Sequence, residues 1–321
     1  MSYRIGVDIG GTTVGIGFVD AKANLFCKTS IPTRIDEKRL DPKELAKRIY
    51  DNTVAFMKEK GISFEDVDSM GIGIPGTVDS INGIVIYANN LEFVQVPFVS
   101  YMEEFFDLPI AIENDANVAA RAEYSAGAGK NLNLNSMVMM TLGTGVGAAF
   151  INNGEVYSGC NMGAGEVGHM VIDMHGKPCN CGRRGCFENY ASASALMESA
   201  VEAMERNKES LLWELCPDKN MNGEIFFEAV RRNDETAKEV FEEYMNYLSV
   251  GVLNIINSVQ PDMLVVGGGI SQVGDLLLGP LRRRVAELVY TKDSDVQTQI
   301  VAAKLGNEAG VLGAALLIEA I

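Results

Sequence analysis

The stretch that decides the fold is RIGVDIGGTTVGIGFVD, residues 4–20, in which two apolar runs flank Gly10-Gly11-Thr12-Thr13. Residues 4–8 and 14–20 have the apolar character of buried strands, and the glycines between them favour a tight turn. A third strand is expected at about residues 24–31, where it would complete a meander. The chain is therefore predicted to open with a strand–turn–strand unit.

A second strand–turn–strand unit is predicted at residues 137–151. Here Leu142-Gly143-Thr144-Gly145-Val146-Gly147 separates two apolar runs, about 133 positions after the first turn. This repetition indicates an internal duplication. A third glycine turn, Gly267-Gly268-Gly269, follows a buried strand expected at residues 263–266.

Strands and helices alternate along the rest of the chain, which predicts an α/β protein with mixed sheets. Asp41 and Gly61 are the expected caps of the first helix. Further helices are expected at 98–106, 116–124, 191–207, 223–232, 234–259, from about 272, and at 309–318. Further strands are expected at 70–75, 84–87, 110–112 and 299–303. The length of 321 residues predicts two domains, with a hinge near residue 115.

Composition excludes several classes of function. The chain has 27 Lys and Arg against 43 Asp and Glu, a net charge of −16, which argues against a nucleic-acid partner. Residues 131–154 form the longest uncharged stretch, but its Asn, Thr and Gly residues argue against a bilayer span. Asp8 interrupts the only early apolar run, so we expect no signal peptide. A soluble cytoplasmic protein is predicted, with its six cysteines as reduced thiols or metal ligands.

The most specific motif is Cys179-x-Cys181-x-x-x-x-Cys186, with His169 ten residues upstream of Cys179. Thiolates and an imidazole are the ligands of a tetrahedral zinc site, and four protein ligands leave no open coordination position. We therefore predict a structural zinc ion. The alternatives are a cluster of metal-free, redox-active thiols, or His175 in place of His169 as the fourth ligand.

The three glycine turns have the character of a polyphosphate site. Their backbone N–H groups and Thr hydroxyls can donate to phosphate oxygens, and Asp8 at a strand end could position hydrated Mg²⁺. Taken singly, such a turn is more often a plain hairpin, but three in one chain reverse that preference and favour the phosphate interpretation. None of them matches a Walker A loop or the G-x-G-x-x-G fingerprint, so neither a P-loop nor a Rossmann site is supported.

Carboxylates mark the remaining candidate positions. Asp115 follows Glu113 and Asn114 where a strand is expected to give way to a helix, so it is either a helix N-cap or a base. A helix N-terminus would lower its pKa and keep it ionised, which phosphoryl transfer tolerates. Glu166 and Glu188 flank the zinc motif, where they would hold a ligand histidine or accept hydrogen bonds from sugar hydroxyls.

Together these motifs resemble the ROK family (repressor, open reading frame, kinase) of sugar kinases, within the actin-like ATPase superfamily. The resemblance spans nearly the whole chain. It rests on Asp8-x-Gly10-Gly11-Thr12, Gly73-Ile74-Pro75-Gly76, Glu113-Asn114-Asp115-Ala116-Asn117, Gly143-Thr144-Gly145-Val146-Gly147, Glu166-Val167-Gly168-His169, the cysteine motif through Glu188, and Gly267-Gly268-Gly269.

The resemblance implies a two-domain actin-like ATPase (ribonuclease H-like) fold with a zinc-bound loop in the larger domain. The small α/β domain would comprise residues 1–115, completed by a C-terminal helix at 305–321. The large α/β domain would comprise residues 116–304, with ATP in the cleft. We also expect a homo-oligomer, either a dimer or a tetramer.

The resemblance also assigns roles to residues, with Asp115 as the base that takes the proton from the sugar's 6-hydroxyl. The implied sugar ligands are Gly76, Asn89 or Asn90, Asn114, Glu166, His169 and Glu188. The implied sites for ATP and Mg²⁺ are Asp8, Gly10, Gly11, Thr12, Thr13, Gly143, Thr144, Gly145, Gly147, Gly268 and Gly269. The implied Zn²⁺ ligands are His169, Cys179, Cys181 and Cys186.

Two positions depart from the family pattern. Many family kinases have Lys where this chain has Thr13, and many glucokinases have Asn-Leu-Gly-Trp where this chain has Asn90-Leu91-Glu92-Phe93. The second departure lies near the implied sugar pocket and therefore bears on specificity.

The leading hypothesis is an ATP-dependent hexose kinase acting on glucose, with sugar and ATP as its partners and neither nucleic acid nor a membrane. The alternatives within the family are a kinase of N-acetylmannosamine or N-acetylglucosamine and a fructokinase. A sugar-responsive repressor is less favoured, because the first strand begins by Arg4 and the chain is acidic. An actin-like filament protein is disfavoured too, because it would not need the carboxylates that flank the zinc motif.

Overall fold

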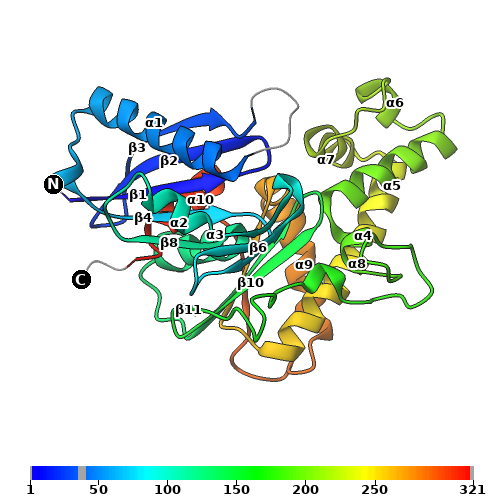
Figure 1. The fold of residues 1–321 in the computed structure, drawn as a ribbon. Coiled ribbons are helices and arrows are strands. Elements are labelled where there is room, and N and C mark those ends of the chain that lie inside the picture. The colour runs from blue at the N-terminus through cyan, green and yellow to red at the C-terminus, as the bar shows by residue number, and fades with distance from the viewer. Residues whose placement is uncertain (1, 35–40, 319–321) are drawn as a thin grey trace. The chain divides into compact units, whose positions relative to one another are not determined.

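The computed structural model describes residues 2–34 and 41–318 (Figure 1). Contacts divide the described residues into two compact units. Unit 1 takes its residues from Met1–Asn133, Phe150–Ala164 and Lys304–Ile321, and unit 2 from Leu134–Ala149 and Gly165–Ala303. The domain boundaries expected from the sequence stay a prediction.

The main sheet of unit 1 has the strand order β3-β2-β1-β4-β8. The strand β1 is central, antiparallel to β2 and parallel to β4, and β4 is parallel to β8. The predicted meander is therefore present, and it is extended on its other side by parallel strands. The strands are β1 (Tyr3–Ile9), β2 (Thr13–Asp20), β3 (Leu25–Pro32), β4 (Val67–Ile74) and β8 (Ile110–Asn114).

The helix α10 (Ala309–Ala315) packs closely on this sheet because two strand positions are glycine. A Cβ atom at Gly6 of β1 would lie 1.9 Å from the carbonyl oxygen of Val311, and one at Gly71 of β4 would lie 1.7 Å from that of Ala314. Any side chain would thus displace the helix. The helix is shorter than the predicted 309–318, since residues 316–318 form a turn and bends. Residues 319–321 of the predicted segment lie outside the described residues.

The helix α1 (Pro42–Lys60) begins and ends where the sequence predicts. The Asp41 carboxylate accepts hydrogen bonds from the N–H groups of Lys43 and Glu44, and Gly61 ends the helix with φ at 68°. The other elements of unit 1 are a sheet of β5 (Thr77–Asp79), β6 (Ile84–Ala88) and β7 (Phe93–Val96), and the helices α2 (Phe98–Glu103) and α3 (Asp115–Ser125). The helix α2 is shorter than the predicted 98–106.

The second five-stranded sheet repeats the strand order of the first, as the matched glycine turns predict. Its order is β11-β10-β9-β12-β13, in which β9 and β12, and β12 and β13, are parallel. The strand β10 leaves unit 2 after Ala149, so its end and β11 count with unit 1. The strands are β9 (Ser136–Leu142), β10 (Val146–Asn152), β11 (Glu155–Val156), β12 (Met263–Gly267) and β13 (Gln299–Ala302).

The remaining helices all belong to unit 2. They are α4 (Glu188–Ala191), α5 (Ala193–Arg206), α6 (Leu212–Leu215), α7 (Gly223–Arg231), α8 (Glu235–Val259) and α9 (Asp275–Leu288). The apolar residues that recur every three or four positions along α8 are buried from Ala237 to Ile255, but Val259 is 49% exposed where the helix ends. Among the described residues, no helix combines the length and the apolar character that crossing a membrane requires.

Candidate functional site

In unit 1, the glycine turn after β1 is held by the end of β3. The Thr33 hydroxyl donates to the carbonyl oxygen of Gly10 at 2.7 Å, and the Thr33 N–H donates to that of Thr12 at 2.9 Å. Thr33 is fully buried, whereas Thr12 and Thr13 are exposed. The turn therefore has a fixed backbone and two hydroxyl groups open to solvent, as a phosphate-binding turn requires.

The N-cap of α3 is Asn114, and the expectation that Asp115 could be that cap is wrong. The Asn114 side-chain oxygen accepts hydrogen bonds from the N–H groups of Ala116 (2.9 Å) and Asn117 (3.2 Å). Its amide nitrogen donates to the carbonyl oxygen of Gly76 at 2.8 Å. Asn114 therefore ties the Gly76 turn to the start of α3, and Asp115 occupies the first helical position.

The sequence-based expectation for the pKa of Asp115 is also wrong. Burial raises the pKa of this carboxyl group, and hydrogen bonds from the N–H groups of Ala116 and Asp115 and from Asn114 offset that effect only in part. Burial and the charge of Asp115 together raise the pKa of Asp8 from 3.8 to about 6. Desolvation thus outweighs the helix N-terminus, and the two carboxylates disfavour each other's ionisation.

The other predicted sugar ligands of unit 1 lie at turns. Gly76 has φ at 102°, and a Cβ atom there would lie 2.1 Å from the carbonyl oxygen of Tyr87, so only glycine fits. Asn89 and Asn90 are exposed in a 3₁₀ turn after β6, where the Asn89 side-chain oxygen accepts from the Tyr87 hydroxyl at 3.1 Å. Asn90 borders the first glycine turn, since its Cβ lies 3.7 Å from where a Gly11 Cβ would be.

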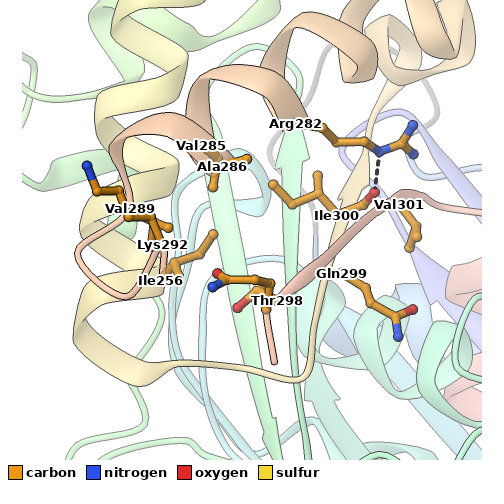
Figure 2. A pocket seen from close by; sticks show the side chains of 11 residues that line it. Ile256, Arg282, Val285, Ala286, Val289, Lys292, Thr298, Gln299, Ile300 and Val301 are labelled. Atoms are coloured by element: carbon orange, nitrogen blue, oxygen red, sulfur yellow. Dashed lines mark hydrogen bonds between the residues drawn. The ribbon is translucent and has the colours of Figure 1, made fainter. Parts of the chain in front are cut away.

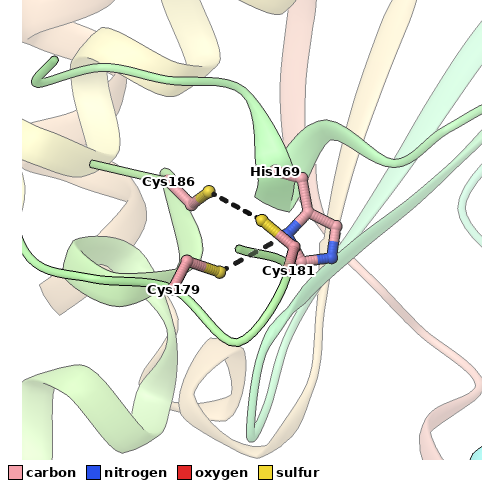
Figure 3. Close-up of side chains that lie close together, drawn as sticks. All are labelled: His169, Cys179, Cys181 and Cys186. Atoms are coloured by element: carbon pink, nitrogen blue, oxygen red, sulfur yellow. Dashed lines mark hydrogen bonds between the residues drawn. The ribbon is translucent and has the colours of Figure 1, made fainter. Parts of the chain in front are cut away.

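In unit 2, the four predicted metal ligands come together (Figure 3). One ligand atom from each of these residues lies within 4.8 Å of every other. The Cys181 and Cys186 sulfur atoms are 3.5 Å apart, and the Cys179 sulfur lies 3.7 Å from Nδ1 of His169. Among the described residues, His175 does not join this group.

The carboxylates that flank the motif lie on either side of the His169 ring. Oε1 of Glu188 is 3.4 Å from Nδ1, and Oε2 of Glu166 is 4.0 Å from Nε2. The Glu188 side chain is 18% exposed and that of Glu166 72% exposed. The other oxygen of Glu188 lies against the second glycine turn, where it is 2.6 Å from the position of a Cβ at Gly145. Glu188 therefore borders both the histidine and this turn.

The second and third glycine turns are neighbours. A Cβ atom at Gly268, whose φ is 89°, would lie 2.1 Å from the carbonyl oxygen of Leu142, the residue before the second turn. The N–H group of Ala193, at the start of α5, donates to the carbonyl oxygen of Gly143 at 2.9 Å. Both predicted turns are thus fixed at the ends of adjacent strands β9 and β12.

A polar pocket of about 520 Å³ opens beside the second glycine turn. Thr144, Gly145 and Glu188 line it, and so do residues that the sequence analysis missed: Lys177, Asn180, Asn189, Ser192 and Ser194. The only sequence signal for these residues is their position in or close to the cysteine motif.

A second pocket, of about 420 Å³, has a more apolar lining among the residues that the structure describes. It is lined by residues of α8, α9 and β13, and Figure 2 shows the apolar side chains of Ile256, Val285 and Ile300 among them. Arg282 at its edge is engaged, because Nε donates to the carbonyl oxygen of Ile300 at 2.7 Å and a terminal nitrogen pairs with Asp275. The described residues that line it include no carboxylate, histidine or cysteine.

Comparison with known proteins shows the family of the chain. A family model described as the ROK family matches residues 4–321. The chain belongs to the ROK family. The glucokinase of Halalkalibacterium halodurans is 34% identical over 321 residues, which cover 99% of this chain and 95% of that protein.

Solved structures of the ROK family show the same α/β fold. A ROK family glucokinase from Streptomyces griseus, in complex with glucose and AMPPNP, is 31% identical with a TM-score of 0.79, and the match covers 98% of this chain and 99% of that one. The family also includes regulators. The xylose repressor of Caldicellulosiruptor bescii is 27% identical over 98% of this chain, which covers 77% of the repressor.

Proposed function

We propose that the protein is an ATP-dependent glucokinase that transfers the γ-phosphoryl group of ATP to the 6-hydroxyl of glucose. The full-length similarity to proteins named glucokinase supports this function, as does the glucose and AMPPNP complex of a relative. The observation in this chain that carries the proposal is Asp115, a carboxylate at the start of α3 whose pKa burial raises toward the working range of a base.

Asp115 is the proposed base. Its carboxylate accepts the proton of the 6-hydroxyl as that oxygen bonds to the γ-phosphorus and the bond from phosphorus to the ADP oxygen breaks. Asn114 holds the backbone of α3 in place through two hydrogen bonds, and the Asp115 carboxylate accepts a hydrogen bond from the N–H group of Ala116 at 2.8 Å. Positioning of this kind is the main contribution that proteins make to phosphoryl transfer.

Each unit has its own proposed sugar ligands. Asn114, Gly76 and one of Asn89 and Asn90 belong to unit 1, and Glu166, His169 and Glu188 belong to unit 2. Carboxylates and amides suit a row of sugar hydroxyls, because each can accept or donate in a fixed direction. Glu188 is held more firmly than Glu166, since its side chain is mostly buried and contacts the His169 ring.

The first two glycine turns are the proposed phosphate ligands, the third is proposed to lie by the nucleotide, and Asp8 is the residue that would hold hydrated Mg²⁺. Asp8 fits that role because its half-buried position and the nearby charge of Asp115 disfavour its negative charge, and a bound cation would offset both effects. When bound, Mg²⁺ neutralises charge that develops on the transferred phosphoryl group. We propose that the backbone N–H groups of these turns and the exposed hydroxyls of Thr12 and Thr13 orient the phosphates.

The residues of the cysteine motif fit a zinc ion. Tetrahedral Zn²⁺ with bonds of about 2.3 Å to sulfur and 2.05 Å to nitrogen places two sulfurs about 3.8 Å apart and a sulfur and a nitrogen about 3.6 Å apart. The corresponding distances here are 3.5 and 3.7 Å. We propose Zn²⁺ on His169, Cys179, Cys181 and Cys186, where it would fix the His169 ring beside Glu188.

The test of this function is product analysis with purified protein, ATP, Mg²⁺ and glucose. Formation of glucose 6-phosphate and ADP in equal amounts is expected. If the protein forms no ADP with glucose but phosphorylates an N-acetylated amino sugar or fructose, the family assignment stands and glucose is not the substrate. The expected homo-oligomer and the domain boundaries near residues 115 and 305 stay predictions.

A further inference from the structure

The turn that carries Asn89 and Asn90 contains a residue with an unusual backbone conformation. Glu92 follows the 3₁₀ turn Asn89–Leu91 with φ at 60° and ψ at 30°, in the left-handed region, and its N–H group donates to the carbonyl oxygen of Asn89 at 3.2 Å. Residues with a side chain adopt this region at a cost that glycine avoids.

The side chain of Glu92 makes a contact that glycine could not make. Its Oε1 lies 3.1 Å from a terminal guanidinium nitrogen of Arg34, just beyond the end of β3. The same nitrogen donates to the carbonyl oxygen of Asn90 at 2.9 Å. One guanidinium group therefore joins the side chain of Glu92 to the backbone of Asn90.

The rest of the turn is anchored on its inner side. Leu91 is fully buried, and Phe93 is 1% exposed and lies 6.2 Å from Phe98 between ring centroids. The two asparagines project outward between these anchors, and among the described residues the Asn90 side chain has no hydrogen-bond partner. The backbone of Asn90 is thus fixed while its amide group remains free for a ligand.

We propose that Arg34 and Glu92 form a clamp that positions Asn89 and Asn90 for the sugar. This inference rests on the proposed function, and it makes Arg34 and Glu92 positioning residues that do not touch the substrate. The clamp combines a left-handed backbone at Glu92 with a charged contact to Arg34. It acts on the turn that contributes sugar ligands, so it affects sugar binding more than ATP binding.

The experiment compares steady-state kinetics of the wild type with Arg34→Ala, Arg34→Lys, Glu92→Ala and Glu92→Gly. Arg34→Ala is expected to raise KM for glucose about three- to tenfold, the range for losing a partly exposed charge-assisted hydrogen bond, with KM for ATP unchanged. Arg34→Lys should recover most of that loss. Glu92→Ala should resemble Arg34→Ala, whereas Glu92→Gly should stay closer to the wild type because glycine relieves the backbone.

The matched control is Arg231→Ala, which removes a half-exposed arginine paired with Glu228 in α7. Hydrogen–deuterium exchange of residues 88–93 gives a readout that does not depend on turnover, and exchange should be faster in Arg34→Ala than in the control. If Arg34→Ala is active and leaves both the exchange of residues 88–93 and the KM for glucose unchanged, the clamp is refuted and the proposed function is not. A wild-type protein that phosphorylates no hexose would overturn the proposed function, and the sugar-positioning role with it.

Discussion

Replacing Asp115 with asparagine separates its role in chemistry from its role in structure. Asparagine has nearly the same shape, and its side-chain oxygen can still accept the hydrogen bond from the Ala116 N–H that Asp115 accepts at 2.8 Å. The cap of α3 is untouched, because Asn114 supplies it. The variant therefore loses the proton acceptor and keeps the contacts of the helix.

The expected loss in kcat is about 10²–10⁴-fold, equivalent to roughly 2.7–5.5 kcal/mol of barrier, since general-base catalysis contributes in that range. Stability at neutral pH should be equal or slightly higher. Burial disfavours the charge on Asp115, and that charge raises the pKa of Asp8, so its removal relieves both effects. In the wild type, activity should fall as the pH drops through the raised pKa of Asp115, because the base must be ionised.

The assay is ADP release coupled to a spectrophotometric reaction, with glucose affinity and thermal unfolding measured on the same samples. Asp107→Asn is the matched control, since Asp107 is an exposed carboxylate of unit 1. A variant at position 115 that retains near-wild-type kcat would refute the assignment of the base. A variant that loses activity together with glucose binding and cooperative unfolding would show that Asp115 is structural.

Three further predictions follow from the two units. Wild-type protein purified without chelators should contain one equivalent of zinc, and the Cys181→Ser variant should lose the metal and have a looser loop around His169. A zinc content well below one equivalent in the wild type would contradict the zinc site. Folding raises the pKa of Asp8 from 3.8 to about 6. The protonated Asp8 carboxyl group therefore stabilises the folded state below pH 4, and this stabilisation is lost as the pH rises through 6. Asp8→Asn should therefore raise the free energy of unfolding at pH 7 by at most about 3 kcal/mol and have little effect at pH 4, and a variant less stable at pH 7 would refute this. Glu188→Gln should raise KM for glucose far more than KM for ATP, and an equal rise in both would place Glu188 elsewhere in the mechanism.

The glycine turns and the cysteine motif could be predicted because their signals are local. Residues 10–13 and 143–147 each follow a strand, and the structure places them at equivalent positions of two sheets with the same strand order. Cys179, Cys181 and Cys186 lie close in sequence, so a short loop is enough to bring their sulfur atoms together.

What could not be predicted depends on burial and on contacts between distant segments. The sign of the pKa shift of Asp115 follows from desolvation, which its position at a helix start does not reveal. The contact of Arg34 with Glu92 joins residues 58 positions apart, and nothing in the sequence between them indicates it. The close packing of α10 on Gly6 likewise joins opposite ends of the chain.

The most direct test of the account is a comparison of kcat/KM for glucose, mannose, fructose, N-acetylmannosamine and N-acetylglucosamine under one condition with ATP and Mg²⁺. The account predicts that glucose has the highest value and that its product carries the phosphate on the 6-oxygen. An acetamido sugar or fructose that exceeds glucose tenfold would contradict the glucokinase assignment, and the absence of phosphoryl transfer to any of the five would contradict the kinase itself.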